Sequence, residues 1–452
     1  MVGVYRVLGR CRKRASAFVF GNYGLMWAGS SSKIKSTLKF SEGPVQYIKR
    51  AMESSIFKAS TQYPVVMVCG QRQTGKSTML RHLAEPDRVY VSFDKHETRR
   101  LAENDPALFF ETYGHKLLID EFQRVPSILI AIKDIVDNAR YNGEKPNGMF
   151  WLTGSQKFVM MKNISETLAG RVAIFSMLPL SQREIEGKES EPFNPDIDAL
   201  KTRDYEKKTL NSTFERIFQG GMPKLADDKT LDRDLYFSSY MDTYIERDVS
   251  ALEQVGKLDE FRSLVTYLAA NTAQELNYNS ISKEIGVSSP TVKEWITILE
   301  RSGIIFILRP YYNNISKRLV KTPKCYFMDT GLATYLTRWP TYETLMNGNA
   351  AGAFFETFVV GEILKSYYNS GKEPDIYYYR DIDKKEIDLL MLGPDKVYPI
   401  EIKKSKTPSE PDKNFAVLEK FGLQVMPGLI LCMADELFPL NRNAWLCPIT
   451  KI

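Results

Sequence analysis

The sequence predicts an α/β fold, in which a parallel sheet with a phosphate loop and covering helices is followed by a helical region and a second α/β domain. Three observations carry this prediction. Residues 65–83 show the pattern of a strand, a glycine-flanked loop and a helix. Apolar strands and helical segments alternate as far as about residue 186, which is typical of a parallel sheet. A helix and three strands follow residue 350.

Residues 70–77 satisfy the pattern G-x-x-x-x-G-K-[ST] between a strand and a helix. In such a loop the backbone N–H groups hold phosphates, the lysine reaches the β- and γ-phosphates, and the hydroxyl binds Mg²⁺. The pattern therefore predicts ATP and Mg²⁺ as cofactors. The residues predicted to contact the nucleotide are Gly70, Gln71, Arg72, Gln73, Thr74, Gly75, Lys76, Ser77 and Thr78.

A second set of polar residues follows the predicted strands at 88–94, 116–121 and 149–152. Asp120 and Glu121 end the middle strand of this set, at the sheet edge where α/β proteins bind ligands. We expect Asp120 to join Ser77 in holding Mg²⁺, and Glu121 to orient or deprotonate the attacking water. The alternative is that the two acids only cap a strand before the turn at Pro126. Thr153 follows the last strand and is a candidate sensor of the γ-phosphate.

Several motifs in this region resemble one family. The loop at 70–77 and the segments LIDEFQRVP, FWLTGSQKF, LAGRVAIF and LPLSQREI together resemble the AAA-type ATPases of bacteria and archaea that carry a C-terminal nuclease-like domain. The resemblance covers about residues 42–186, within a predicted ATPase domain of 42–190. It implies that Thr153 or Ser155 is the sensor and that Arg171 stabilises the transition state, in its own site or in that of a neighbouring subunit. A surface ion pair is the alternative for Arg171.

Charge is concentrated at the start of the chain. The formal net charge is +6, and residues 1–41 contain eight basic residues and no acid, so the remainder carries about −2. We expect residues 1–41 to be a disordered basic tail, with a transit peptide or a poor signal peptide as alternatives. No run reaches the length of a membrane span. Five scattered cysteines without C-x-x-C spacing favour a reducing, cytoplasmic location and no structural metal.

The middle of the chain, residues 205–330, is predicted to be a helical lid and a winged helix, after an aperiodic linker at 186–204. Gly221-x-Pro223 resembles a lid motif that packs on adenine in signal-transducing AAA-related ATPases; a helix-ending turn is the alternative. Helices at 261–270, 280–284 and 289–301 and strands at 304–308 and 324–328 give the winged-helix order.

The helix of this region that would read DNA presents a nearly neutral face. Phosphate contact would be poor, so a rigid module that relays the nucleotide state is favoured over sequence-specific binding. A compact basic stretch after the wing is the best nucleic-acid patch outside the tail. It comprises Lys317, Arg318, Lys321 and Lys324.

The last predicted domain, residues 350–452, gathers acids and a lysine. Glu356 lies on a helix, Asp388 on one strand of a hairpin, and Glu401 and Lys403 on one face of the other strand. Three carboxylates could bind Mg²⁺ and leave Lys403 to activate water. The arrangement resembles the PD-(D/E)XK nuclease core, which implies Glu356, Asp388 and Glu401 as metal ligands and Asp388, Glu401 and Lys403 as catalytic residues. A solvated strand face or a structural module is the alternative.

These observations predict an ATP-binding and ATP-hydrolysing AAA-type protein that couples its nucleotide state to a nuclease-like effector domain. DNA and a second copy of the chain are the candidate partners, with no membrane. The alternative is a non-catalytic, nucleotide-dependent switch or scaffold whose C-terminal domain mediates protein interaction.

Overall fold

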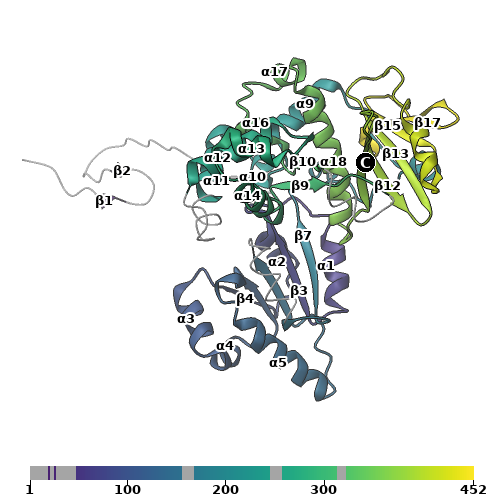
Figure 1. Ribbon diagram of the computed structural model, residues 1–452. Coiled ribbons are helices and arrows are strands. Elements are labelled where there is room, and N and C mark those ends of the chain that lie inside the picture. Colours follow the sequence, from purple (N-terminus) through teal and green to yellow (C-terminus); the bar gives the residue numbers. More distant parts are fainter. Residues whose placement is uncertain (1–18, 21–24, 27–46, 155–166, 245–256, 313–321) are drawn as a thin grey trace, which may run out of the picture. The chain divides into compact units, whose positions relative to one another are not determined.

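The computed structural model describes residues 19–20, 25–26, 47–154, 167–244, 257–312 and 322–452 (Figure 1). The chain divides into two units, Met1–Gln46 and Tyr47–Ile452. Within the first unit, strands β1 (Val19–Phe20) and β2 (Leu25–Met26) pair antiparallel. This pairing lies in the segment predicted to be disordered; the rest of that segment is outside the described residues.

The second unit begins with a parallel five-stranded sheet in the order β4-β5-β6-β3-β7. This confirms the predicted α/β fold class. The strands span β3 Val65–Gly70, β4 Val89–Ser92, β5 Leu117–Asp120, β6 Phe150–Gly154 and β7 Val172–Met177.

Successive side chains of each strand point to opposite faces of this sheet. Since both sets are apolar in β3, helices cover both faces. Val66 and Val68 of β3 pack with α1 (Glu53–Ser60) and α2 (Lys76–Leu83). Val65, Met67 and Cys69 of the same strand face the opposite core. The helices of that second face are α3 His96–Asn104, α4 Pro106–Tyr113 and α5 Ile128–Tyr141.

A helical region follows the sheet. Its first helices are α7 Gln182–Ile185, α8 Ile197–Thr202, α9 Leu210–Gln219, α10 Pro223–Asp227 and α11 Arg233–Tyr244. Helix α8 falls inside the stretch predicted to be an aperiodic linker. Asp196 caps this helix and Leu200 is its buried residue. One buried apolar residue in a six-residue helix is too few to show a helical periodicity in the sequence.

The predicted helices and strands of the winged-helix segment are present as α12 Leu258–Ala270, α13 Tyr278–Ile285, α14 Ser289–Arg301, β9 Ile305–Leu308 and β10 Lys324–Phe327. Strand β8 (Gln274–Glu275) completes an antiparallel sheet in the order β8-β10-β9. Helices α16 (Thr330–Leu336) and α17 (Tyr342–Asn347) follow. The name winged helix stays a prediction.

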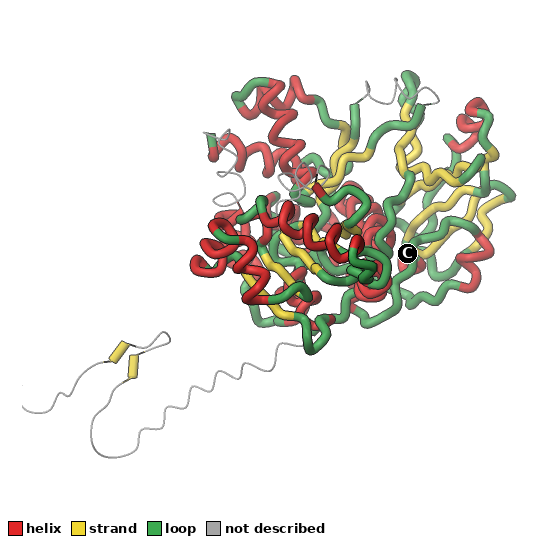
Figure 2. Tube along the Cα trace, turned by 90° about the horizontal axis from the view of Figure 1, so that it is seen from below, coloured by secondary structure: helices red, strands yellow, loops and turns green. Residues whose placement is uncertain are grey.

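The C-terminal region is a mixed sheet in the order β11-β12-β13-β15-β17-β16, beside helix α18 (Ala351–Tyr368), and β14 also pairs with β13 (Figure 1). Figure 2 shows strands gathered near the marked C-terminus. Its strands are β11 Ile376–Arg380, β12 Glu386–Gly393, β13 Lys396–Ile402, β14 Gln424–Val425, β15 Gly428–Cys432, β16 Phe438–Asn441 and β17 Ala444–Pro448.

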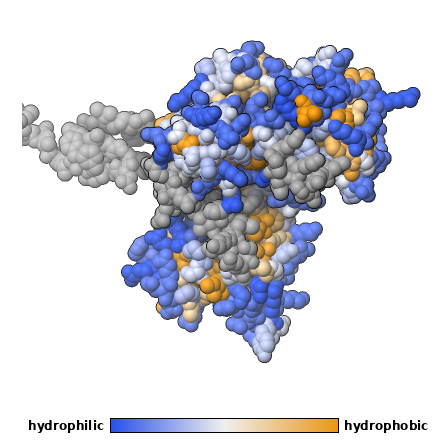
Figure 3. All heavy atoms as spheres, viewed as in Figure 1, coloured by the Kyte–Doolittle hydropathy of each residue, from blue (hydrophilic) through white to orange (hydrophobic). Residues whose placement is uncertain are grey.

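One hydrophobic core joins the helical and C-terminal regions. It contains Phe214 of α9, Trp295 of α14, Phe355 of α18 and Ile400 of β13. Regions that the sequence analysis treats as separate domains are thus packed continuously. The face in Figure 3 is mainly hydrophilic, with separate apolar spots. Across the described residues, no helix combines the length and apolar character needed to cross a membrane.

Candidate functional site

The phosphate loop connects the buried strand β3 to helix α2, as predicted. Gly70 has φ 137°, and a Cβ there would lie 2.2 Å from the carbonyl oxygen of Met177. Gly75 caps α2 in the left-handed region, with φ 90°. Both positions therefore require glycine, one for close approach of the backbone and the other for its conformation.

Lys76 is buried in this loop, and its Nζ donates to the carbonyl oxygens of Gly70 (3.0 Å) and Gln71 (2.7 Å). Burial lowers the pKa of Lys76 to about 8, although the negative charge of Glu121 opposes this shift. Among the described residues, this buried ammonium contacts two carbonyl oxygens and no anion. A phosphate group would supply one.

The other predicted loop residues differ in exposure. Thr74 is buried and its hydroxyl donates to the Gln71 carbonyl at 2.9 Å, while Gln73 is exposed in a left-handed conformation. Arg72 is partly buried, and Thr78 is exposed on α2. Ser155, the alternative sensor, lies outside the described residues.

Asp120 gathers hydroxyl groups from three other elements. Its Oδ1 accepts from Ser77 Oγ of α2 at 2.7 Å and from Thr153 Oγ1 of β6 at 2.9 Å, and its Oδ2 accepts from the Tyr90 hydroxyl of β4 at 2.9 Å. The structure thus brings the two predicted Mg²⁺ ligands, Ser77 and Asp120, into direct contact. Their hard oxygen atoms beside the phosphate loop fit Mg²⁺.

Thr153 is predicted to sense the γ-phosphate. In the structure its hydroxyl group donates to the carboxylate of Asp120. Tyr90 is absent from the sequence-based predictions. An aromatic residue in a strand is usually interpreted as a packing residue. The role of Tyr90 depends on the parallel pairing of β4 with β5, which brings its hydroxyl group to Asp120.

Glu121 directly follows β5 and has φ 55°, in the left-handed region. Such a conformation in a residue other than glycine is unusual and is often found at functional sites. Gln123 Nε2 donates to the Glu121 carboxylate. Burial raises the pKa of Glu121, opposed by the charge of Lys76. A carboxylate with a raised pKa beside the phosphate loop has the properties of a general base.

Arg50 is a connecting residue that the sequence analysis missed. Its buried guanidinium donates to Glu184 Oε1 (2.8 Å), to the Thr74 carbonyl (2.7 Å) and to the Leu178 carbonyl (2.8 Å). It therefore ties the phosphate loop to the end of β7 and to helix α7. A single arginine before a short helix carries no pattern that would have revealed this.

The lid region contacts the phosphate loop directly. A Cβ on Gly75 would lie 4.0 Å from Pro223 Cγ, so the Gly221-x-Pro223 segment is adjacent to the loop. Gln71 Nε2 donates to the buried hydroxyl of Tyr240 on α11 at 2.9 Å. A Cβ on Gly303, after α14, would lie 3.7 Å from Gln71 N. The described helices are therefore placed to respond to changes in the loop.

Arg171 lies away from the phosphate loop of its own chain. Its carbonyl accepts from Val65 N at the amino end of β3, whereas the loop begins at Gly70 at the other end. Its guanidinium binds Asp137 of α5 at 2.7 and 2.8 Å, which raises the pKa of Arg171. This position corrects the expectation of a role in its own site, since β3 separates the two by roughly 17 Å of strand rise.

The C-terminal hairpin of β12 and β13 forms as predicted. Leu389 pairs with Ile400, which places Asp388 next to Glu401 across the hairpin. Lys403 Nζ lies 2.6 Å from Glu401 Oε1 and 3.5 Å from Asp388 Oδ2. Asp388 Oδ2 also accepts from Ile402 N at 2.8 Å. Two predicted ligands and the predicted catalytic lysine are thus brought together.

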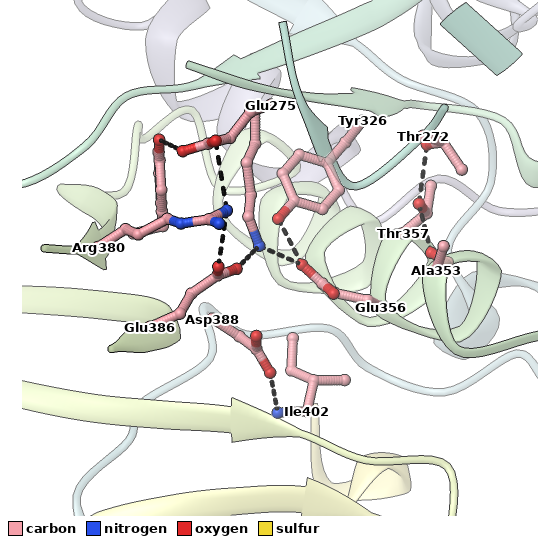
Figure 4. A network of polar contacts seen from close by, with 12 residues as sticks. Thr272, Glu275, Tyr326, Ala353, Glu356, Thr357, Arg380, Glu386, Asp388 and Ile402 are labelled. Atoms are coloured by element: carbon pink, nitrogen blue, oxygen red, sulfur yellow. Dashed lines mark hydrogen bonds and ion pairs between the residues drawn. The ribbon is translucent and has the colours of Figure 1, made fainter. Parts of the chain in front are cut away.

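Glu356 faces a different cation. Lys324 of β10 reaches into this region, with its Nζ 3.2 Å from Glu356 Oε1 and 2.6 Å from Glu386 Oε1. The hydroxyl of Tyr326 also donates to Glu356 at 2.7 Å. Figure 4 shows Glu356, Glu386 and Tyr326 converging on this point, with Asp388 beside them. The Lys324 side chain is only 4% exposed, so it belongs to the cluster and not to a nucleic-acid patch.

Burial dominates the electrostatics of these acids. It raises the pKa of Glu356 and of Glu401 to about 7, and the charge of Asp388 adds to both shifts. Burial lowers the pKa of Lys324, but Glu356, Asp388 and Glu386 outweigh that effect, and the net shift is upward. The negative charge of the cluster is therefore reduced in two ways: lysines bind its carboxylates, and the raised pKa values of Glu356 and Glu401 favour their protonated forms.

Metal binding by Glu356, Asp388 and Glu401 stays a prediction. Among the described residues, no group of three or more His, Cys, Asp and Glu side chains is arranged to hold a metal ion. Lysines contact these carboxylates instead: Lys324 contacts Glu356, and Lys403 contacts Asp388 and Glu401. Of the basic stretch predicted after the wing, Lys324 is buried, and Lys317, Arg318 and Lys321 lie outside the described residues.

Three segments of the chain match known protein families. Residues 62–186 match the AAA domain family. Residues 210–343 and 351–452 match two further families, each described as a domain of unknown function. The AAA match covers the phosphate loop, Asp120 and Glu121, so these residues lie in a segment that is similar to AAA domains. The C-terminal match does not identify a nuclease.

Relatives of similar length are found in bacteria. An uncharacterized protein of Mycobacterium tuberculosis is 25% identical over 408 residues, which cover 89% of this chain and 84% of the relative. One of Haemophilus influenzae is 22% identical over 365 residues, covering 75% and 82%. Among solved structures, the Walker-type ATPase of Pyrococcus abyssi aligns with a TM-score of 0.38 and 14% identity, covering 64% of this chain and 96% of that one.

Proposed function

We propose that this protein binds ATP with Mg²⁺ and hydrolyses it, and that the nucleotide state is passed to the helical and C-terminal regions. The match of residues 62–186 to the AAA domain family supports this proposal. The observation that carries the proposal is the contact of Ser77 and Thr153 with Asp120, beside the buried Lys76. A cation and a metal-binding pair of oxygens at one sheet edge suit a triphosphate.

Each residue has a defined role in this proposal. Lys76 exchanges its two carbonyl partners for the β- and γ-phosphates. Ser77 and Asp120 hold Mg²⁺, which when bound neutralises charge on the phosphates. Glu121 accepts a proton from the attacking water, which its raised pKa favours. Gln71 transmits the change to Tyr240 of α11.

Steady-state ATP hydrolysis by the wild type, Lys76→Ala and Glu121→Gln tests the proposal. We expect both variants to fall to background, and Glu121→Gln to retain ATP binding in a filter assay. Equal rates in all three proteins would contradict it. They would leave the alternative of a non-catalytic nucleotide-dependent switch.

Cleavage of nucleic acid by the C-terminal domain is a second candidate function. It is favoured by the adjacency of Asp388, Glu401 and Lys403 on one hairpin. Nicking of plasmid DNA by the wild type with Mg²⁺ or Mn²⁺, lost in Asp388→Ala and Lys403→Ala, would support this function and would mean that a metal ion replaces Lys403 on these carboxylates. Without cleavage on any substrate, the domain is an effector that acts by contact.

A further inference from the structure

A cavity of about 650 Å³ lies where α7, α9, α10, α18 and the end of the chain meet. This volume falls within the usual range for small-molecule sites. Leu225, Phe358 and Ile449 supply apolar walls, and Gln182, Arg216 and Thr450 supply polar ones. No residue of the loop at 70–77 lines the cavity, so it is separate from the proposed nucleotide site.

Three polar atoms in the wall have no hydrogen-bond partner within the described part of the chain. Gln182 Oε1, Arg216 Nη2 and Thr450 Oγ1 are each buried without a hydrogen bond to any described residue. Buried polar atoms are nearly always satisfied, so each such atom needs an explanation. Their occurrence around one cavity indicates a molecule that supplies a donor to Gln182 and an acceptor to Arg216.

Among these three residues, the positively charged Arg216 gives the clearest indication of what the cavity binds. Burial lowers the pKa of Arg216, and the acids that act on it most strongly are Glu362, Asp329 and Glu186. In the part of the chain that the structure describes, none of these three forms an ion pair with Arg216. Arg216 is half-buried as a residue, but its Nη2 atom is buried, and a buried charged donor without an acceptor is costly.

Those three acids are already committed to other donors. Glu362 accepts from Gln182 N at 2.7 Å and from Lys365 at 2.8 Å. Glu186 binds Lys188 and Lys208. Asp329 accepts from the backbone N–H groups of Gly221 (2.6 Å) and Leu332 (2.8 Å). Arg216 is thus left for an external anion.

We propose that this cavity binds a small organic anion whose phosphate or carboxylate group contacts Arg216. A guanidinium offers two parallel N–H donors that match either group. Gln182 Oε1 accepts from a hydroxyl or amine of the same molecule, Thr450 contacts its polar part, and Leu225 and Phe358 contact its apolar part.

The site is connected to the phosphate loop by two routes. Helix α10 begins with Pro223 beside Gly75 and contributes Leu225 to the cavity. Helix α7 contributes Gln182 to the cavity, and its Glu184 holds Arg50, which donates to the Thr74 carbonyl. Anion binding therefore changes ATP affinity, and ATP changes anion affinity by the same factor. This coupling, unlike the binding itself, rests on the proposed function.

Calorimetric titration of the Lys76→Ala protein with inorganic phosphate and with succinate tests the binding without interference from the nucleotide site. We expect at least one probe to bind, and Arg216→Gln to weaken it by about tenfold or more, as for loss of a charged hydrogen bond. Arg183→Gln is the matched control, because Arg183 also lines the cavity but already binds Asp204. Preference for phosphate assigns a phosphorylated molecule, and preference for succinate a carboxylated one.

Binding of neither probe, or equal binding by Arg216→Gln, would overturn the proposal. If Arg216→Gln does not fold, a crystal of the unchanged protein soaked in selenate decides: an anomalous peak beside Arg216 supports the site, and its absence rejects it. ATP affinity with and without succinate tests the coupling. If ATP does not bind, the proposed function fails while anion binding by Lys76→Ala stands.

Discussion

Two acidic sites of this molecule invite the same interpretation from sequence, yet they differ in what surrounds their carboxylates. At the phosphate loop, the side-chain donors to Asp120 within the described residues are the hydroxyl groups of Ser77, Thr153 and Tyr90. In the C-terminal cluster, Glu356 binds Lys324, and Glu401 binds Lys403. Hydroxyl groups leave the negative charge available to a cation, whereas lysines neutralise it. Spacing of acids alone therefore does not establish a metal site.

The largest expected difference is between the ATP hydrolysis rates of the variants Asp120→Asn and Asp388→Asn. Because Asp120 is the predicted Mg²⁺ ligand, its replacement should lower the rate of ATP hydrolysis by on the order of a hundredfold or more. Asp388→Asn should leave that rate unchanged. A steady-state phosphate-release assay at saturating ATP measures both, and equal loss in the two variants would break the distinction between the sites.

Lys324→Met tests whether the cluster depends on its buried lysine. Removing one partner of a buried ion pair should destabilise the protein by about 3 kcal/mol, since Glu356 and Glu386 lose their cation. Lys403→Met is the matched control, because its side chain is 40% exposed and its loss should cost less than about 1 kcal/mol. Urea denaturation followed by circular dichroism compares them. Similar midpoints for the two variants would show that Lys324 does not hold the cluster.

The raised pKa values make the cluster sensitive to pH. Glu356 and Glu401 have pKa values of about 7 when folded, against an ordinary 4.5, so the folded state binds their protons more tightly. Their contribution to stability is fully present below pH 4.5 and is lost as the pH rises through 7. We expect each group to contribute a loss of about 2–3 kcal/mol between pH 5 and pH 8 in urea denaturation.

Glu356→Gln should remove part of this dependence. Glu103→Gln is the control, because Glu103 is exposed on α3, far from the cluster in sequence. An identical pH profile in the wild type and Glu356→Gln would mean that these acids do not titrate in that range.

Arg171→Ala should have the smallest effect. The pair with Asp137 is partly exposed and lies at the amino end of β3, so we expect ATP hydrolysis to change by no more than about twofold. Light scattering with and without ATP, measured alongside the rate, sharpens this result. An ATP-dependent oligomer together with a strong loss of rate would instead assign Arg171 to the site of a neighbouring copy.

The same contrast shows how far the sequence could predict the structure. The phosphate loop, Asp120 and Glu121 are encoded locally, because an apolar strand delivers each group to the same sheet edge. The contacts of Arg50 and Lys324 were not predictable, since each residue binds partners distant in sequence. Lys324 was instead predicted to lie in a basic patch. The hairpin of Asp388 and Glu401 was predicted, but the lysine that reaches Glu356 comes from β10, in another part of the chain.

Manganese binding, followed by electron paramagnetic resonance, tests the difference between the two sites most directly. With a non-hydrolysable ATP analogue, we expect one bound Mn²⁺ per chain, lost in Asp120→Asn and retained in Asp388→Asn. Mn²⁺ bound without nucleotide, and lost in Asp388→Asn, would contradict this account and make the C-terminal cluster a metal site.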